Sequence, residues 1–135
     1  MDETDLTQTL EDRRQLDAAR GPGCYALVAG VPDSAQSVID RWHDAHDAAP
    51  DEDVFARLAA AETALYVGAA SNVYERLCDH AGDVRKAAFL SAFPPTALHS
   101  LWPKDSAEVA FCEEKAVGRA LSGAATRVWT DGDLL

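Results

Sequence analysis

Residues 64–80 read A-L-Y-V-G-A-A-S-N-V-Y-E-R-L-C-D-H, a pattern that predicts a strand, a tight turn and a helix. Residues 64–67 form a short apolar run. Gly68 favours the turn, because glycine adopts backbone conformations that other residues resist. Ser71 or Asn72 can cap the helix that follows, and Asn72 with Glu75 three residues later resembles a capping box.

Three polar side chains of this helix, Asn72, Arg76 and His80, are spaced four residues apart and form a polar stripe beside the apolar face. An amide, a guanidinium and an imidazole in one stripe are typical of a site that handles phosphate. Two alternatives stay open. Arg76 could be an ordinary surface arginine, and His80 could bond the end of the helix before Gly82.

The residues of this stretch resemble the signature of the GIY-YIG nucleases. The second half of that signature is matched by Y-V-G at residues 66–68 together with the polar stripe. The first half is matched by G-C-Y at residues 23–25. The two halves occur in the right order, and the resemblance covers residues 21–121.

The resemblance implies an α/β fold with a small, mainly antiparallel sheet flanked by helices. Hydrophobic patterning agrees, because short apolar runs near glycine and proline predict strands at 24–31, 96–102 and 126–130 in addition to 64–67. At this length we expect a single domain that spans residues 1–135.

Further helices are expected at residues 5–19, within an N-terminal segment 1–20, and at residues 83–92. Between the first two strands, residues 33–61 are expected to hold two more. This helical insert departs from the hairpin-like connection that the family typically has. It is a candidate substrate-recognition element, dimerisation arm or lid, and we expect its helices to pack on the outside of the sheet.

The last helix, which Asp105 is expected to cap, carries a carboxylate among apolar residues. At about 100° per residue, the apolar side chains that spread to both sides of Glu113 are Val109, Ala110, Ala116, Val117 and Ala120. A carboxylate on an apolar face is costly unless it is paired or binds a metal. Glu114 is expected to point elsewhere. The alternative is that Glu113 pairs with a buried arginine, Arg76 among them.

The resemblance implies a catalytic set of Tyr25, Tyr66, Arg76, His80 and Glu113. Glu113 would bind Mg²⁺ or Mn²⁺, and Arg76 would neutralise charge on the phosphate. One of the two tyrosines would activate or orient the attacking water, with His80 assisting. Gly68 and Asn72 would contact the substrate.

The function expected from this resemblance is metal-dependent hydrolysis of phosphodiester bonds in DNA. A first alternative is a GIY-YIG-like domain that binds nucleic acid or a protein without catalysis. A second is a small acidic interaction module in which the motif is accidental. The oligomeric state is open, with a homodimer among the options.

The charge of the chain bears directly on a DNA partner. The net charge is −11, from 23 acidic and 12 basic residues, and the composition resembles that of proteins from salt-loving archaea. Such a chain repels nucleic acid in dilute buffer, whereas in molar salt the Debye length falls to about 3 Å and the repulsion largely disappears. The simpler alternative is that the acidity excludes a nucleic-acid partner.

Other features of the sequence indicate less about its function. No apolar run is long enough to span a membrane and the start M-D-E-T-D is not a signal peptide, so a cytoplasmic protein is expected. His43 and His46 could share a metal, but a solvated polar face is the favoured interpretation. Buried free thiols are expected at Cys24, Cys78 and Cys112. Packing in the core is expected for Trp42, Trp102 and Trp129.

We predict that the folded state requires high salt. Self-repulsion among 23 carboxylates is relieved by screening, so the melting temperature should rise between low and molar KCl. Thermal unfolding followed by circular dichroism across that range measures the effect. A melting temperature that stays flat or falls contradicts the prediction.

Overall fold

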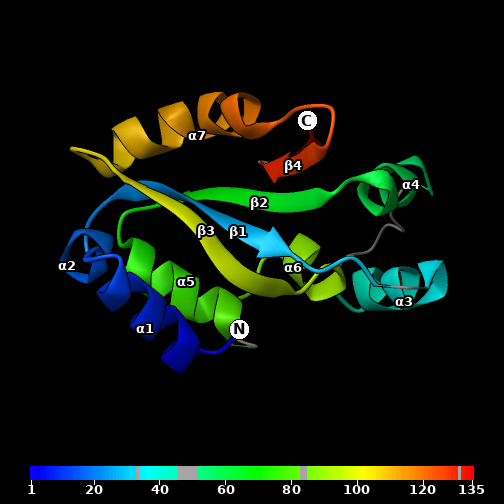
Figure 1. The fold of residues 1–135 in the computed structure, drawn as a ribbon, viewed down its shortest axis with the longest axis horizontal. Helices are drawn as coiled ribbons and strands as arrows, with labels where there is room; N and C mark the ends of the chain where they lie inside the picture. The colour runs from blue at the N-terminus through cyan, green and yellow to red at the C-terminus, as the bar shows by residue number, and fades with distance from the viewer. Residues whose placement is uncertain (33, 46–51, 83–84, 131) are drawn as a thin grey trace.

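The computed structural model describes residues 1–32, 34–45, 52–82, 85–130 and 132–135. Its elements follow one another along the chain as shown in Figure 1. They are α1 (Glu3–Asp12), α2 (Leu16–Ala19), β1 (Gly23–Ala29), α3 (Ala35–Ala45), α4 (Glu52–Ala60), β2 (Thr63–Ala70), α5 (Val73–Ala81), α6 (Ala88–Ala92), β3 (Pro95–Pro103), α7 (Ala107–Leu121), β4 (Thr126–Thr130) and β5 (Asp133–Leu134).

The strands of the described chain form one sheet in the order β3-β1-β2-β4-β5. Strand β1 contains the G-C-Y half of the sequence motif and pairs antiparallel with both β2 and β3. Strand β4 pairs parallel with β2 and antiparallel with β5. The expected α/β class, with a mainly antiparallel sheet flanked by helices, is confirmed. The parallel pairing was not predicted. It is possible because a long connection through α5, α6, β3 and α7 separates β2 from β4.

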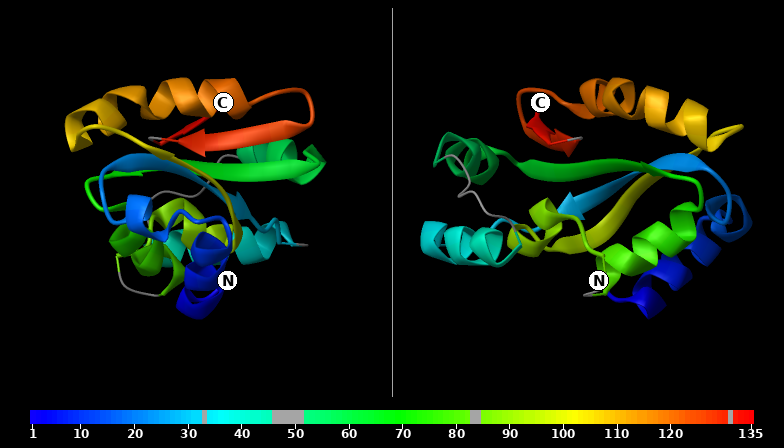
Figure 2. Two further views of the ribbon diagram at one scale, coloured as in Figure 1. Left: turned by 60° about the vertical axis from the view of Figure 1, so that its left-hand side comes forward. Right: turned by 180° about the vertical axis from the view of Figure 1, so that it is seen from behind.

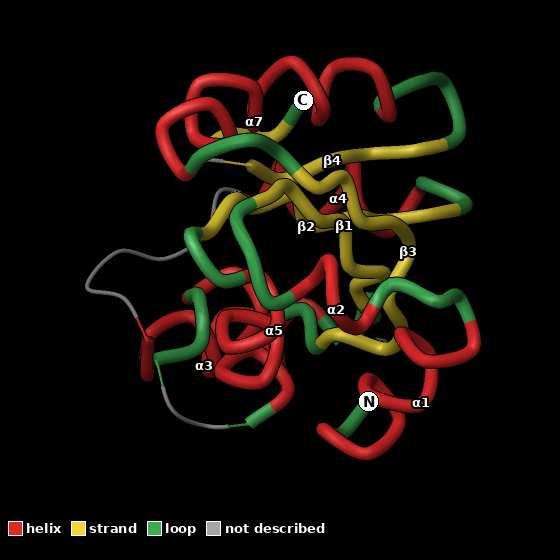
Figure 3. Tube along the Cα trace, turned by 90° about the vertical axis from the view of Figure 1, so that its left-hand side faces the viewer, coloured by secondary structure: helices red, strands yellow, loops and turns green. Residues whose placement is uncertain are grey.

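Helices cover both faces of this sheet. Helix α7 lies over one face, and α1, α2 and α5 lie on the other, as the views in Figures 2 and 3 show. Because successive strand residues point to opposite faces, Leu27 belongs to the larger core with α1 and α5. Its neighbour Ala26 belongs to a smaller core, which Val117 and Leu121 of α7 cover.

The connection between β1 and β2 contains two helices, α3 and α4, as the sequence predicted for residues 33–61. Residues 33 and 46–51 of this predicted insert lie outside the described residues. Val38, Trp42 and Leu58 are buried and belong to the larger core cluster. The described part of the connection is thus helical and not a pair of core strands, as expected, and its apolar residues join the core cluster at one end of the sheet.

Three predicted helices differ at their boundaries. The helix expected at 5–19 is divided into α1 and α2 by Arg14, whose φ of 57° is left-handed. Beside it, Arg13 donates to the carbonyls of Leu98 and His99 of β3, at 2.9 Å each, which fixes the bend against the sheet. Of the helix expected at 83–92, the structure has α6, and residues 83–84 lie outside the described residues. Helix α7 is capped by Ser106, not Asp105.

The three cysteines are free thiols, as predicted, but their burial differs. Cys24 is buried, Cys78 is half-buried and Cys112 is exposed. Within the described part of the chain, no helix combines the length and the apolar composition that crossing a membrane requires.

Candidate active site

Tyr25 of β1 and Tyr66 of β2 lie on the same face of the sheet. The strands are antiparallel, with Tyr25 opposite Gly68 and Leu27 opposite Tyr66. Directly opposed residues of an antiparallel pair share a face, so the two tyrosines are diagonal neighbours. Their ring centroids are 6.4 Å apart. The register of β1 and β2 therefore brings the two halves of the sequence motif together.

Gly68 lies within β2, not in the turn that the sequence predicted. It does not have a left-handed φ, so backbone freedom does not explain the glycine. A Cβ at this position would lie 2.5 Å from Cζ of Tyr25 and 2.9 Å from its Cε2. Glycine is needed because the ring of Tyr25 occupies the space of a side chain. The predicted contact of Gly68 with substrate stays a prediction.

Helix α5 supplies the polar stripe. Asn72 is its N-cap and accepts a hydrogen bond from the backbone N–H of Glu75 at 3.1 Å, as predicted. This structural role is established, whereas substrate contact by Asn72 stays a prediction. One turn later, the Arg76 guanidinium donates to the carbonyl of Arg85 and lies 3.7 Å from Oδ2 of Asp79. Asp79 of the same helix and the backbone of Arg85, after the helix, thus hold the guanidinium in position.

His80 is completely buried and lies against both tyrosines. Its Nε2 is hydrogen-bonded to Oη of Tyr25 at 2.8 Å. Its ring also packs edge-on against Tyr66, with centroids 5.4 Å apart. His80 therefore does not bond the end of α5, which was the alternative open from the sequence. It joins the helix to the sheet.

The surroundings of His80 keep its imidazole neutral. Burial, followed by the positive charge of Arg76, lowers the pKa of His80 to about 3. Nδ1 accepts the backbone N–H of Ala87 at 3.5 Å. A neutral imidazole that accepts at Nδ1 carries its proton on Nε2, so His80 donates to the oxygen of Tyr25. The hydroxyl proton of Tyr25 is left for another acceptor.

Tyr25 also keeps its proton at neutral pH. Burial raises the pKa of Tyr25 well above its usual 10, and the neighbouring Tyr66 and Glu114 add to the increase. Arg76 opposes this through its charge and a hydrogen bond to Tyr25, but burial is the larger cause. Tyr25 can therefore donate a hydrogen bond or orient a group, but at neutral pH it is not a base that removes a proton from water.

The two adjacent glutamates of α7 occupy positions opposite to those predicted. Glu113 pairs with Lys104, and 46% of its side chain is exposed. Glu114 instead faces the tyrosines and accepts a hydrogen bond from Oγ1 of the buried Thr130 at 3.1 Å. The prediction that Glu113 faces the core and Glu114 points elsewhere is wrong, and Glu113 does not line the cavity that holds the other motif residues.

The error lies in which apolar residues of α7 face the sheet. Val109, Ala116 and Ala120 are exposed, although the sequence analysis counted them as core. The side of the helix that packs on the strands carries Ala110, Val117, Gly118 and Leu121. At about 100° per residue, the centre of this set falls close to Glu114. Helix α7 approaches β4 closely at Gly118, because a Cβ there would lie only 3.1 Å from Cγ2 of Thr130.

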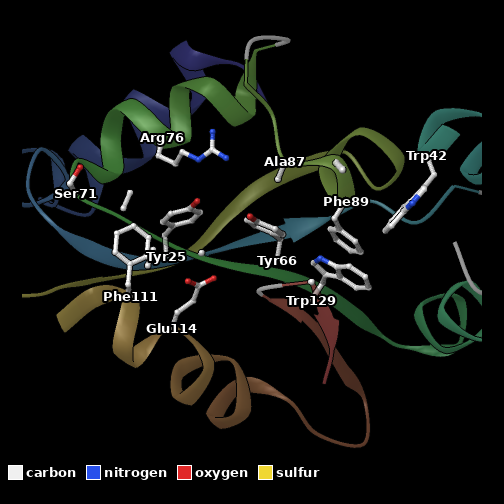
Figure 4. A pocket seen from close by; sticks show the side chains of 15 residues that line it. Tyr25, Trp42, Tyr66, Ser71, Arg76, Ala87, Phe89, Phe111, Glu114 and Trp129 are labelled. Carbon is white, nitrogen blue, oxygen red and sulfur yellow. The ribbon is translucent and has the colours of Figure 1, made fainter. Parts of the chain in front are cut away.

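The end of β4 explains how Glu114 reaches residues on the opposite face of the sheet. The described pairing of β4 with β2 ends where Thr130 meets Val67. Strand β2 continues three residues further, to Ala70. Beside this extension the carboxylate of Glu114 lies on one side of Tyr25 and the guanidinium of Arg76 on the other, as Figure 4 shows.

These side chains line a cavity of about 540 Å³ that is open to solvent. Tyr25, Tyr66, Arg76 and Glu114 form its polar part, and His80 lies behind the tyrosines. Of the predicted catalytic set, the structure therefore groups four residues and replaces Glu113 by Glu114. An arginine facing a carboxylate across a phenol is an arrangement that can hold a phosphate and a cation side by side.

The carboxylate among the described residues that line the cavity is that of Glu114, an oxygen donor of the kind that Mg²⁺ and Mn²⁺ prefer. Among the described residues, no group of three or more histidine, cysteine, aspartate or glutamate side chains could hold a metal ion. Mg²⁺, however, is usually bound through one or two carboxylates together with waters and substrate phosphate oxygens. Glu114, at the wall of an open cavity, supplies such a carboxylate. The side chain of His43 and the whole of His46 lie outside the described residues.

Other residues of the cavity wall were not selected from the sequence as site residues. Phe111 and Ser71 line the end near Arg76, and Trp42, Phe89 and Trp129 line the other end. Trp129 joins the three residues of the aromatic end, because Phe89 is stacked on it with ring centroids 5.1 Å apart and Trp42 lies edge-on to it at 5.6 Å. Packing of these two tryptophans in the core was expected. Phe111 could have been found from its spacing, one turn before Glu114 on the same helix.

Comparisons of the chain with models of protein families, with curated proteins and with solved structures find no match.

We predict that Gly68→Ala destabilises the fold through the ring of Tyr25. The added methyl group forces the buried ring to move, and overpacking of this kind typically costs about 1–3 kcal/mol. Gly123→Ala is the matched control, because a Cβ there has no described atom within 4 Å. Chemical denaturation of both variants measures the difference. A Gly68→Ala variant as stable as the control contradicts the account of Gly68.

We predict that His80 makes the protein less stable as the pH falls. The unfolded chain protonates histidine near pH 6.5 but the folded chain only near 3, so protons favour unfolding between these values. The free energy of unfolding should fall by up to about 1.4 kcal/mol per pH unit from this group. His80→Gln should flatten the slope, and His99→Gln, at an exposed position, should not. Denaturation at several pH values measures the slopes, and equal slopes in the two variants contradict the prediction.

Proposed function

We propose that the chain is a metal-dependent endonuclease that hydrolyses phosphodiester bonds in DNA with a site of the GIY-YIG type. The observation that carries the proposal is the grouping of Tyr25, Tyr66, Arg76 and Glu114 around one open cavity, with His80 hydrogen-bonded behind. These residues come from β1, β2, α5 and α7, so their meeting is not a consequence of local sequence spacing. The helices α3 and α4 would then be an insert in that fold.

Each residue has a chemical task under this proposal. The guanidinium of Arg76 would contact the phosphate oxygens and stabilise charge that develops on them. The carboxylate of Glu114 would hold Mg²⁺ or Mn²⁺, which would polarise the phosphate. Tyr25, which stays protonated, would donate a hydrogen bond to a phosphate oxygen or to the water. His80 would keep the Tyr25 oxygen in place by donating to it.

Hydrolysis requires that water add to phosphorus and that the bond from phosphorus to the leaving oxygen break. One proton of the water ends on the leaving oxygen, and another group must carry it there. Tyr25 and His80 are poor candidates for that transfer, because their pKa values favour the neutral forms. The half-buried Tyr66, next to both, is placed to orient the water.

The same pKa values favour a second candidate function. A site whose phenol does not ionise and whose imidazole scarcely accepts a proton suits binding without cleavage. In that case the chain would be a GIY-YIG-like module that binds nucleic acid or a protein, and Arg76 would bind a phosphate or carboxylate without turnover. Cleavage by the wild-type protein separates the two functions.

The adjacent glutamates provide the sharpest test of the nuclease. We expect wild type to cleave single-stranded, duplex or branched DNA with Mg²⁺ or Mn²⁺ in high salt, and EDTA to stop it. Glu114→Gln should lose about 100-fold or more in rate, because the amide no longer holds the cation. Glu113→Gln should stay active, since Glu113 pairs with Lys104 outside the cavity. Gel assays of cleaved oligonucleotides measure the rates, and melting temperatures confirm that both variants fold.

Arg76→Ala should lower the rate about 100-fold while Arg76→Lys retains part of it, because lysine keeps the charge but not the planar fork.

Equal activity of Glu113→Gln and Glu114→Gln would remove the metal-binding role from Glu114. Absence of cleavage by wild type on all three DNA forms, with both metals and over a range of salt, would favour the binding module.

A further inference from the structure

Phe111 is an apolar ring that the fold leaves largely exposed. Its exposed fraction is 57%, and the other large apolar side chain that the described chain exposes is Val109, at 38%. Phe111 precedes Glu114 by three residues on α7, so the two side chains lie on neighbouring positions of one side of the helix. Both line the cavity that holds Arg76. The ring is therefore exposed at the wall of the candidate active site.

The space next to this ring is bounded by small residues. Ala69, Ala70 and Ser71 line the same end of the cavity, where β2 extends past the described pairing with β4. Figure 4 places Phe111 near Ser71 and Tyr25, at the end away from Trp42 and Trp129. Small side chains leave room for a flat group to approach the ring.

The aromatic residues at the other end of the cavity do not offer such a surface. Phe89 is 2% exposed and Trp42 is 7% exposed. Each of these two rings packs against Trp129, through the stacked and edge-on contacts described above. A planar ligand would have to break that packing to enter. Phe111 is the most exposed aromatic residue among the described residues of the cavity wall.

A single ring fits a nucleobase better than it fits a protein surface. Val109 and Phe111 are two residues apart, which places them about 200° apart around the helix. They do not combine into one apolar patch, and protein interfaces need a contiguous surface much larger than one ring. A base carried by the nucleotide whose phosphate meets Arg76 would be tethered close to Phe111.

We propose that Phe111 stacks on an unpaired base next to the phosphate that Arg76 contacts, so that the substrate is single-stranded or has an unpaired nucleotide at the cleaved bond. The inference rests on the proposed function, since that function supplies the phosphate. A ring can lie flat on a base only where that base is not stacked inside a continuous duplex. Continuous duplex DNA would then be the poorest of the three DNA forms.

Binding can be tested without cleavage, with full-length protein, EDTA in place of metal and salt at which the protein is folded. The probe is a single-stranded oligonucleotide with 2-aminopurine at one position, moved along the strand in a series. Stacking quenches the fluorescence of this base, so one position should be quenched in the complex. Phe111→Ala should lose that quenching and bind about 5- to 100-fold more weakly, the range expected for one base–aromatic stack.

Three further variants separate stacking from other effects. Phe111→Tyr should retain quenching and affinity, and Phe111→Leu, which keeps apolar surface but loses the ring, should not. Val109→Ala is the control for an exposed apolar residue of the same helix and should behave as wild type. Each variant should melt as wild type does, because Phe111 and Val109 are both exposed residues.

Several results would overturn the inference. Unchanged affinity and quenching in Phe111→Ala would do so, as would equal behaviour of the Leu and Tyr variants, or failure of wild type to bind the probe. A dimer in sedimentation experiments that Phe111→Ala dissociates would show that a second copy covers the ring instead.

Failure of the nuclease proposal can be told apart from failure of the stacking proposal. A probe that is bound with Phe111-dependent quenching but never cleaved with metal contradicts catalysis alone, and cleavage that Phe111→Ala leaves unchanged contradicts stacking alone.

Discussion

The hydrogen bond between His80 and Tyr25 joins helix α5 to the sheet at a place that water does not reach. Both partners are polar groups buried to nearly their full extent, and the Tyr25 oxygen is hydrogen-bonded to Arg76 as well. Loss of the Tyr25 hydroxyl would leave Nε2 of His80 unsatisfied, at a typical cost of about 1–3 kcal/mol. The bond also fixes the orientation of α5 about its axis, and with it the side on which Arg76, one turn earlier, faces the cavity.

This anchoring constrains the strands as well. The ring of Tyr25 lies where a side chain at position 68 would be, so β2 must carry glycine opposite it. Because the described pairing of β4 with β2 ends at Val67, the last residues of β2 lie beyond it, on the side where α7 covers the other face of the sheet. Glu114 enters the site there, held by Thr130 at the end of β4. Glu114 and Arg76 thus come from opposite faces of the sheet and contribute opposite charges to one cavity.

Local spacing was sufficient to predict the strands of the motif and the start and end of α5, whereas the expectation that Tyr25, Tyr66, Arg76 and His80 lie together came from the resemblance to the GIY-YIG signature. It failed where a side chain's direction depends on a partner distant in the sequence. The face of α7 that is buried depends on β4, and alanines at 116 and 120 are as consistent with an exposed face as with a core. Hydrophobicity alone therefore placed Glu113 inward, whereas the close approach of Gly118 to Thr130 turns Glu114 inward. The left-handed Arg14 and the parallel pairing of β2 with β4 likewise depend on contacts that no local pattern encodes.

The charge of the chain sets the kind of contact that could hold an anionic substrate here. With a net charge of −11, long-range attraction to DNA is absent, and in molar salt charges further apart than about 3 Å scarcely interact. A bond from Arg76 to a phosphate acts at contact distance and survives such screening better than steering does, but binding through phosphates still weakens as salt rises. Stacking of a base on an aromatic ring involves no net charge and is not screened. A site that works in an acidic protein at high salt would therefore gain more from one exposed ring beside its phosphate contact than from additional lysines around it.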